Sequence, residues 1–190
     1  NISRRRPLLG AVAVACALLV GLFAAWPYLQ FPGLPASTDT ELHVFRIAEM
    51  GYSLRAGNPY PRWAPNFYHG YGYPIFNYYA PLTYHLGHAL TLGRPELAAV
   101  GAKALFVLAH ITGSVGAYLL GRRFGGEGGG LLGAIGFSFA PYIQLINPHI
   151  RGDLAEVLGL AFLPWTLWAW ERVWQARRGA TTQWGGVTPG

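Results

Sequence analysis

The chain has 190 residues, of which 52% are hydrophobic and only 12% are charged, and its formal net charge is +6. An ordinary soluble domain carries about 25% charged residues, so this composition excludes a typical water-soluble fold. The basic residues lie beside apolar segments and do not gather on one polar face, which argues against nucleic acid as a partner.

The apolar residues fall into separate runs, as expected when lipid surrounds the side chains. They predict transmembrane helices over residues 8–29, 97–120, 131–146 and 154–174. The first run follows three arginines, so a signal peptide is the alternative interpretation for it. Its length and its aromatic exit, Trp26-Pro27-Tyr28, favour a membrane anchor. Cys16, the single cysteine, lies in this run, so an intrachain disulfide is excluded.

Residues 30–96 form the largest segment outside the apolar runs. Thr38 followed by Glu41 matches a capping box, and the residues after it predict an amphipathic helix at the membrane surface over 39–55. Residues 58–84 are dense in Pro, Gly and aromatic side chains without a steady period. This composition predicts turns and short helices with a fixed shape, because disordered segments are poor in aromatic residues.

The distribution of arginine predicts an orientation. Arginines cluster at 4–6, 122–123 and 172–178, whereas segment 30–96 balances its arginines with an equal number of acids. By the positive-inside rule the N-terminus is cytoplasmic. Segment 30–96 and a polar turn at 147–153 are therefore predicted to lie outside, facing the same compartment.

Asp39, His43 and Arg46 recur at positions i, i+4 and i+7 and would share one face of a helix. On that face they could act as base, proton relay and phosphate clamp. The alternative is that Asp39 only complements the helix dipole while the other two side chains are solvated. Asp39 and Glu41 could hold a divalent metal if the chain were extended, but in a helix they point apart.

Two further groups could carry chemistry. The aromatic side chains between 60 and 79 could form a platform for sugar rings or a groove for an isoprenoid chain, or they could simply lie at a membrane interface. Arg151 and Glu156 are ionisable groups at the start of the last apolar run, which makes them functional candidates. A local ion pair between Arg151 and Asp153 is the structural alternative. The sequence contains no glycine-rich phosphate loop and no zinc-protease or hydrolase motif.

Three segments carry a resemblance to a known family. They read D-T-E-L-H-V-F-R-I, then Y-P-R-W-A-P-N with G-Y-G-Y-P-I-F-N-Y-Y-A-P-L, then H-I-R-G-D-L-A-E-V-L-G-L-A-F-L-P. Together they resemble the N-terminal part of bacterial membrane proteins related to 6-pyruvoyl-tetrahydropterin synthase, which are similar in layout to GT-C glycosyltransferases and YfhO-type membrane proteins. The resemblance implies an all-α, polytopic protein of the bacterial cytoplasmic membrane.

The resemblance also implies an activity, the transfer of a sugar from a polyprenyl-phosphate donor at the outer face. It implies an acidic residue in the first outer loop, and Asp39 is the matching position, as base or metal ligand. Arg151 and Glu156 belong to the family's R-G-x-x-x-E block. The residues expected to bind the sugar donor are His43, Arg46, Arg62, Trp63, Tyr68, Arg151 and Glu156.

The resemblance also has a consequence for the length of the protein, and an alternative function has to be considered beside it. GT-C proteins usually have eight or more spans and this chain begins at Asn1, so we expect it to be part of a longer protein. The alternative function is a non-catalytic transporter, lipid-binding or structural membrane protein. A transporter would use Lys103, His110 and Glu156 as polar groups along one cavity, whereas catalysis predicts that Asp39 and Arg151 converge.

Overall fold

The computed structural model describes the backbone of residues 2–184 and the side chains of residues 9–177. The long helices are α1 (Ile2–Ala24), α3 (Thr40–Arg55), α5 (Ala98–Ser138) and α6 (Leu154–Trp184). Shorter elements are α2 (Trp26–Gln30), α4 (Pro81–Leu90), η1 (Tyr68–Gly70), η2 (Ile75–Asn77), η3 (Pro95–Leu97) and the wide, π-helical η4 (Tyr142–Arg151). In this part of the chain the only β-pairing is an isolated bridge between Ala64 and Tyr73. The predicted all-α class is confirmed.

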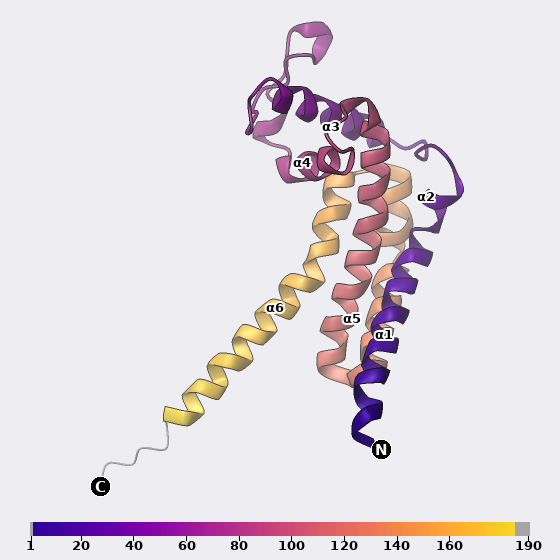
Figure 1. Cartoon of the computed structure of the whole chain (residues 1–190), viewed down its shortest axis with the longest axis vertical. Helices are drawn as coiled ribbons and strands as arrows, with labels where there is room; N and C mark the ends of the chain where they lie inside the picture. The colour runs from indigo at the N-terminus through magenta and orange to yellow at the C-terminus, as the bar shows by residue number, and fades with distance from the viewer. Residues whose placement is uncertain (1, 185–190) are drawn as a thin grey trace.

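Helix α5 is a hairpin of two arms, 98–124 and 127–138, because the backbone leaves the helical conformation at Gly125 and Gly126. Figure 1 shows the chain reversing there and returning along the first arm. Near the bend the arms touch through backbone, since a Cβ on Gly121 would lie 2.4 Å from the carbonyl oxygen of Gly129. The predicted glycine-rich hinge at 121–130 therefore lies at the reversal.

The segment after this hairpin differs from the prediction. The apolar run predicted over 131–146 is interrupted after Ser138, because the residue before Pro141 is disfavoured in helical conformation. The chain then continues as η4 through Arg151, so the predicted polar turn at 147–153 is helical except at its last two residues. Helix α6 begins at Leu154 and runs well beyond the predicted end at 174.

Small residues make the main helix contacts. Ala13, Ala17 and Gly21 of α1 recur every four residues and face α5, where the Ser114 hydroxyl donates to the Ala17 carbonyl at 2.8 Å. A Cβ on Gly21 would lie 2.6 Å from Cα of Ile111. Such stripes let helix backbones approach closely and are typical of membrane bundles.

The elements group at two ends of the bundle (Figure 1). The beginning of α1, the bend of α5 and the end of α6 lie at one end, whereas α2, α3, α4 and the junction of η4 with α6 lie at the other. There, the backbone N–H groups of Thr38 and Asp39 donate to the carbonyls of Ile150 and Arg151 at 3.2 and 2.7 Å. The two polar segments predicted to share one face thus meet at the same end.

By length and composition, one helical segment of the described chain, Pro95–Arg151, could cross a membrane, and Leu9–Ala24 is a shorter apolar helix. The first of these segments includes the bend of α5. Helix α6 is less apolar than these two segments, because it carries several tryptophans and Glu171. Tryptophan is, however, enriched at membrane interfaces. The arrangement in four spans stays a prediction.

Candidate functional site

Helix α3 carries the core of the candidate site. It was predicted over 39–55 and begins at Thr40, with Asp39 as the residue before its first turn. The predicted capping box is wrong, because the Thr38 hydroxyl donates to the Ile150 carbonyl and Asp39 makes no capping hydrogen bond. The first turn is held instead by main-chain bonds to the segment before α6.

The polar face of α3 points inward. His43, Arg46 and Glu49 are only 1%, 6% and 3% exposed, whereas Leu42 and Phe45 are 47% and 54% exposed. The interpretation in which His43 and Arg46 are solvated is therefore wrong. Burying polar groups is tolerated only where they find partners, and α4, the loop before it and the start of α6 supply them.

A chain of polar contacts runs from α3 to α6 through Tyr84 of α4. The Arg46 Nη1 group donates to the Tyr84 hydroxyl at 3.2 Å, and this oxygen lies 3.2 Å from His43 Nδ1. His43 Nε2 lies 3.4 Å from Oδ1 of Asp153. Burial raises the pKa of Tyr84 to about 12, so its hydroxyl stays protonated at neutral pH and donates to His43. With Nδ1 as the acceptor, Nε2 is the ring nitrogen that donates to the carboxylate.

Asp153 and Arg151 organise the start of α6. Oδ1 of Asp153 accepts from the backbone N–H of Glu156 at 3.1 Å, as an N-cap side chain does. Arg151 lies 3.4 Å from Asp153 and 2.6 Å from Glu156, and it donates to the Tyr142 hydroxyl at 2.6 Å. The expected local ion pair is therefore present, and Glu156 joins it.

A groove of about 370 Å³ opens beside Arg46. It is lined by Tyr68, Tyr73, Tyr78 and Tyr79 together with Leu42, Arg46, Phe67 and Ile75. The Arg46 guanidinium carbon lies 3.8 Å from the ring centroid of Tyr79, and its Nε is buried without a hydrogen-bond partner. No carboxylate among the described side chains forms an ion pair with Arg46. The groove therefore offers an uncompensated positive charge beside aromatic rings.

The loop that walls this groove has a fixed shape. Both oxygens of the buried Glu49 carboxylate accept from Asn66, one from its backbone N–H at 3.2 Å and one from its side-chain amide at 3.0 Å. Beyond Asn66, the backbones of Tyr68 and His69 have φ values of 50° and 58°. Residues other than glycine rarely adopt positive φ values. Such outliers persist where surrounding contacts hold them and are frequent at ligand sites.

The structure gathers some of the predicted residues and separates others. His43, Arg46 and Tyr68 belong to the groove or to the polar chain beside it, and Arg151 and Glu156 join through Asp153. Arg62 instead lies on the surface, where it donates to Asn77 at 3.3 Å. Trp63 is 51% exposed and covers Gly72, where a Cβ would meet the indole at 2.2 Å.

Asp39 is half-buried, and its carboxylate has no hydrogen-bond or ion-pair partner in the described part of the chain. Its backbone N–H donates to the Arg151 carbonyl at 2.7 Å, which brings the main chains of the two residues together at the start of α6. The convergence of the Asp39 carboxylate with the Arg151 side chain stays a prediction, because the described contacts of Arg151 are to Asp153, Glu156 and Tyr142. Glu41 is exposed. Residues 9–177 contain no group of three or more His, Cys, Asp or Glu arranged to hold a metal ion, so Asp39 and Glu41 do not by themselves complete a metal site.

The polar groups of the transporter alternative each have a separate partner. Lys103 donates to the Phe31 carbonyl, the Nδ1 of His110 lies 2.8 Å from the Phe106 carbonyl, and Glu156 binds Arg151. Among the described contacts, none joins one of these three groups to another, and the transporter alternative stays a prediction.

Sequence reasoning missed the residues that connect the site. Tyr79 belongs to the aromatic segment that was predicted to form a platform or groove, but Tyr84 lies outside it and gave no signal among the many tyrosines nearby. Asp153 stands immediately before a helix, which is the N-cap signal, but no sequence rule pairs it with His43. Comparisons of the chain with models of protein families, with curated proteins and with solved structures give no match.

The contact between Asp153 and His43 predicts a pH dependence. The hydrogen bond from His43 lowers the pKa of Asp153 below its ordinary value of 3.8, against the opposing effect of burial. A lowered pKa means that the charged carboxylate stabilises the fold fully above about pH 4 and that this contribution is lost as the pH falls through the folded-state pKa. We expect the unfolding midpoint to decline between about pH 5 and about pH 2, and Asp153→Asn to weaken the decline.

Thermal unfolding in detergent at each pH measures this effect. Asparagine is a good N-cap residue, so the variant keeps the start of α6. Glu41→Gln is the control and should follow the wild type, because Glu41 is exposed and pairs with no cation in the described part of the chain. Identical pH curves for the wild type and Asp153→Asn would show that the contact does not stabilise the fold.

Proposed function

We propose that the chain is the N-terminal part of a polytopic membrane protein, with α1, the two arms of α5 and α6 as spans. The small-residue contacts between α1 and α5 support this, as does the gathering of the arginine-rich segments at the end opposite the candidate site (Figure 1). The second arm is too short to span about 30 Å alone, and η4 extends it. In this arrangement α3, α4 and the groove lie outside the cytoplasm.

The function we propose is transfer of a glycosyl group from a lipid-phosphate donor at the outer face of the membrane. One observation carries this proposal: the buried Arg46 guanidinium faces an aromatic groove and has no carboxylate partner among the described side chains. A buried unpaired charge is costly, and a phosphate would compensate it with hydrogen bonds to the planar guanidinium fork. The tyrosine rings beside it suit a sugar face or an isoprenoid chain.

Roles for the remaining residues follow from their contacts. Asp39, whose carboxylate has no partner among the described residues, is proposed as the base that activates the acceptor hydroxyl. Arg151 is engaged by Glu156, Asp153 and Tyr142, so it positions the start of α6 instead of holding phosphate. Arg46 is the proposed phosphate ligand in place of the exposed Arg62. No step of this proposal uses a metal ion.

Replacing Arg46 by methionine in the full-length protein tests the observation that carries the proposal. Methionine keeps an apolar stem and removes the charge, so a polyprenyl phosphate should bind at least about tenfold more weakly, the equivalent of one charged hydrogen bond. Without ligand, the variant should unfold at the same temperature as the wild type or higher, because an uncompensated buried charge is removed. Binding in detergent micelles and thermal unfolding measure the two effects.

Arg62→Met is the matched control, since its guanidinium lies on the surface and contacts Asn77 and the ring of Tyr60. This variant should bind the polyprenyl phosphate as the wild type does. If Arg46→Met binds normally, or if both variants lose binding equally, the groove beside Arg46 is not the phosphate site.

A further inference from the structure

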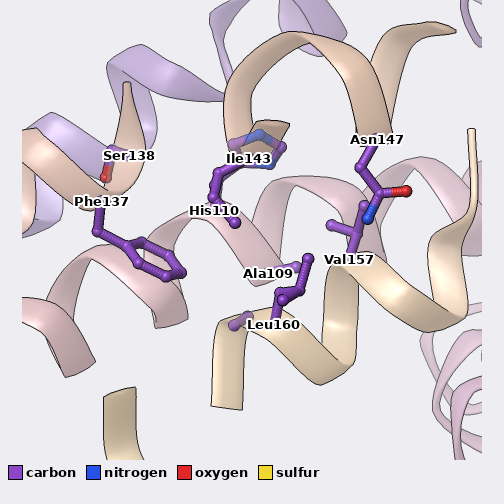
Figure 2. Close-up of a pocket in the computed structure, with 9 residues that line it drawn as sticks. Ala109, His110, Phe137, Ser138, Ile143, Asn147, Val157 and Leu160 are labelled. Atoms are coloured by element: carbon purple, nitrogen blue, oxygen red, sulfur yellow. The ribbon is translucent and has the colours of Figure 1, made fainter. Parts of the chain in front are cut away.

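A small space lies inside the bundle, between the two arms of α5, η4 and α6 (Figure 2). Its volume is about 10 Å³, and apolar side chains such as Ala109, Ile143 and Leu160 form most of its wall. This space is separate from the groove beside Arg46, and none of the proposed catalytic roles uses it.

Polar side chains without partners also line this space. His110, Ser138 and Asn147 are 5%, 2% and 0% exposed. In the described chain, His110 Nε2, the Ser138 hydroxyl and both polar atoms of the Asn147 amide have no hydrogen-bond partner. Buried polar groups are nearly always hydrogen-bonded, and an ordered water is the usual partner where protein atoms are missing.

We propose that this space binds one water molecule, which bridges His110 on the first arm of α5 to Asn147 on η4. The volume fits, because about 10–15 Å³ of such space holds one water. The hydrogen-bonding groups fit too. His110 Nδ1 faces the Phe106 carbonyl at 2.8 Å and donates to it, which leaves Nε2 as an acceptor. A water donates to Nε2 and accepts from the Asn147 amide.

A water fits these groups better than a cation does. Figure 2 shows the Asn147 amide nitrogen directed toward the space beside Val157, where its N–H groups would repel a positive ion. Water has two donor and two acceptor positions, so it can satisfy a mixture of an imidazole acceptor and an amide donor.

This water would also position the candidate site. The carbonyl of Asn147 accepts from the backbone N–H of Gly152 at 2.8 Å, so the residue that holds the water also holds the turn between Arg151 and Asp153. The inference does not depend on the proposed function, since it concerns how η4 is fixed to α5.

A double-mutant cycle in the full-length protein tests the bridge. His110→Phe and Asn147→Leu each leave the other group unpaired, whereas the double variant makes the space apolar. If the two sites were independent, the fold-increases that the single variants cause in the unfolding equilibrium constant would multiply in the double variant. We expect the constant of the double variant to be about fivefold smaller than that product. The control cycle pairs Asn147→Leu with Ser114→Ala, because Ser114 is equally buried but bonds directly to the Ala17 carbonyl. In this control cycle the effects of the two single variants on the unfolding equilibrium constant should multiply.

The direct measurement is an experimental density map of the wild-type protein at a resolution that shows ordered water. A water peak within hydrogen-bond distance of His110 Nε2 and Asn147 is the expected result. An empty space, a direct bond between the two side chains, or multiplicative effects in the His110 cycle would each overturn the proposal.

Discussion

An Asp39→Asn variant of the full-length protein is expected to lose transfer from a lipid-linked sugar donor by about 10²–10⁴-fold, the usual contribution of a general base. The Asp39 carboxylate has no hydrogen-bond or ion-pair partner among the described side chains, and the backbone N–H of this residue donates to the Arg151 carbonyl at 2.7 Å. Asparagine retains the shape of the side chain and its aptitude for the position before a helix. The loss should therefore appear in the rate of transfer, with insertion, thermal stability and donor binding unchanged.

Transfer assays in proteoliposomes with a polyprenyl-phosphate sugar measure this rate. Glu41→Gln is the matched control, because Glu41 is an exposed carboxylate of the same helical turn and should leave the rate unchanged. An unchanged rate in Asp39→Asn would exclude the proposed base. If the wild type binds the donor but transfers nothing, the non-catalytic lipid-binding alternative is favoured.

Gly152→Ala is expected to destabilise the fold by about 3 kcal/mol, the sum of a left-handed backbone penalty and a steric clash. Gly152 adopts φ +73°, and a Cβ there would lie 2.1 Å from the hydroxyl oxygens of both Ser37 and Thr40. These two hydroxyls bond to each other at the start of α3. A methyl group between them would separate α3 from the start of α6, so activity should fall together with stability.

Gly159→Ala is the control for this prediction. Gly159 is a helical residue of α6 with no atom near the position of an added Cβ, so alanine there should be neutral or stabilise by up to about 1 kcal/mol. Denaturant titration in detergent compares the two variants. Equal stability of Gly152→Ala and the wild type would show that the segment before α3 can move away from Gly152 at no cost.

How far the sequence predicts the structure depends on the kind of signal. The helices over most of 8–29, 97–120 and 154–174, and the hinge at 121–130, follow from runs of apolar residues and from glycine, which are local properties. The inward turn of α3 could not be predicted from its pattern. His43 and Glu49 are buried because Tyr84, Asp153 and Asn66 reach them, and these partners are distant in sequence.

The candidate site could be predicted only where a local sequence signal exists. The spacing of Asp39, His43 and Arg46 placed them on one helix face, and two of them are indeed neighbours in the polar chain through Tyr84. Arg62 and Trp63 lie in a segment without periodicity, so nothing in the sequence indicated that they would not line the groove.

The link between the two polar segments has an evolutionary consequence. Thr38 and Asp39 are tied to Ile150 and Arg151 through backbone N–H and carbonyl groups, so any amino acid except proline can preserve the tie. The architecture alone thus places almost no demand on which side chain occupies position 39. If related chains keep an acid there while neighbouring positions drift, selection for chemistry and not for folding is the cause.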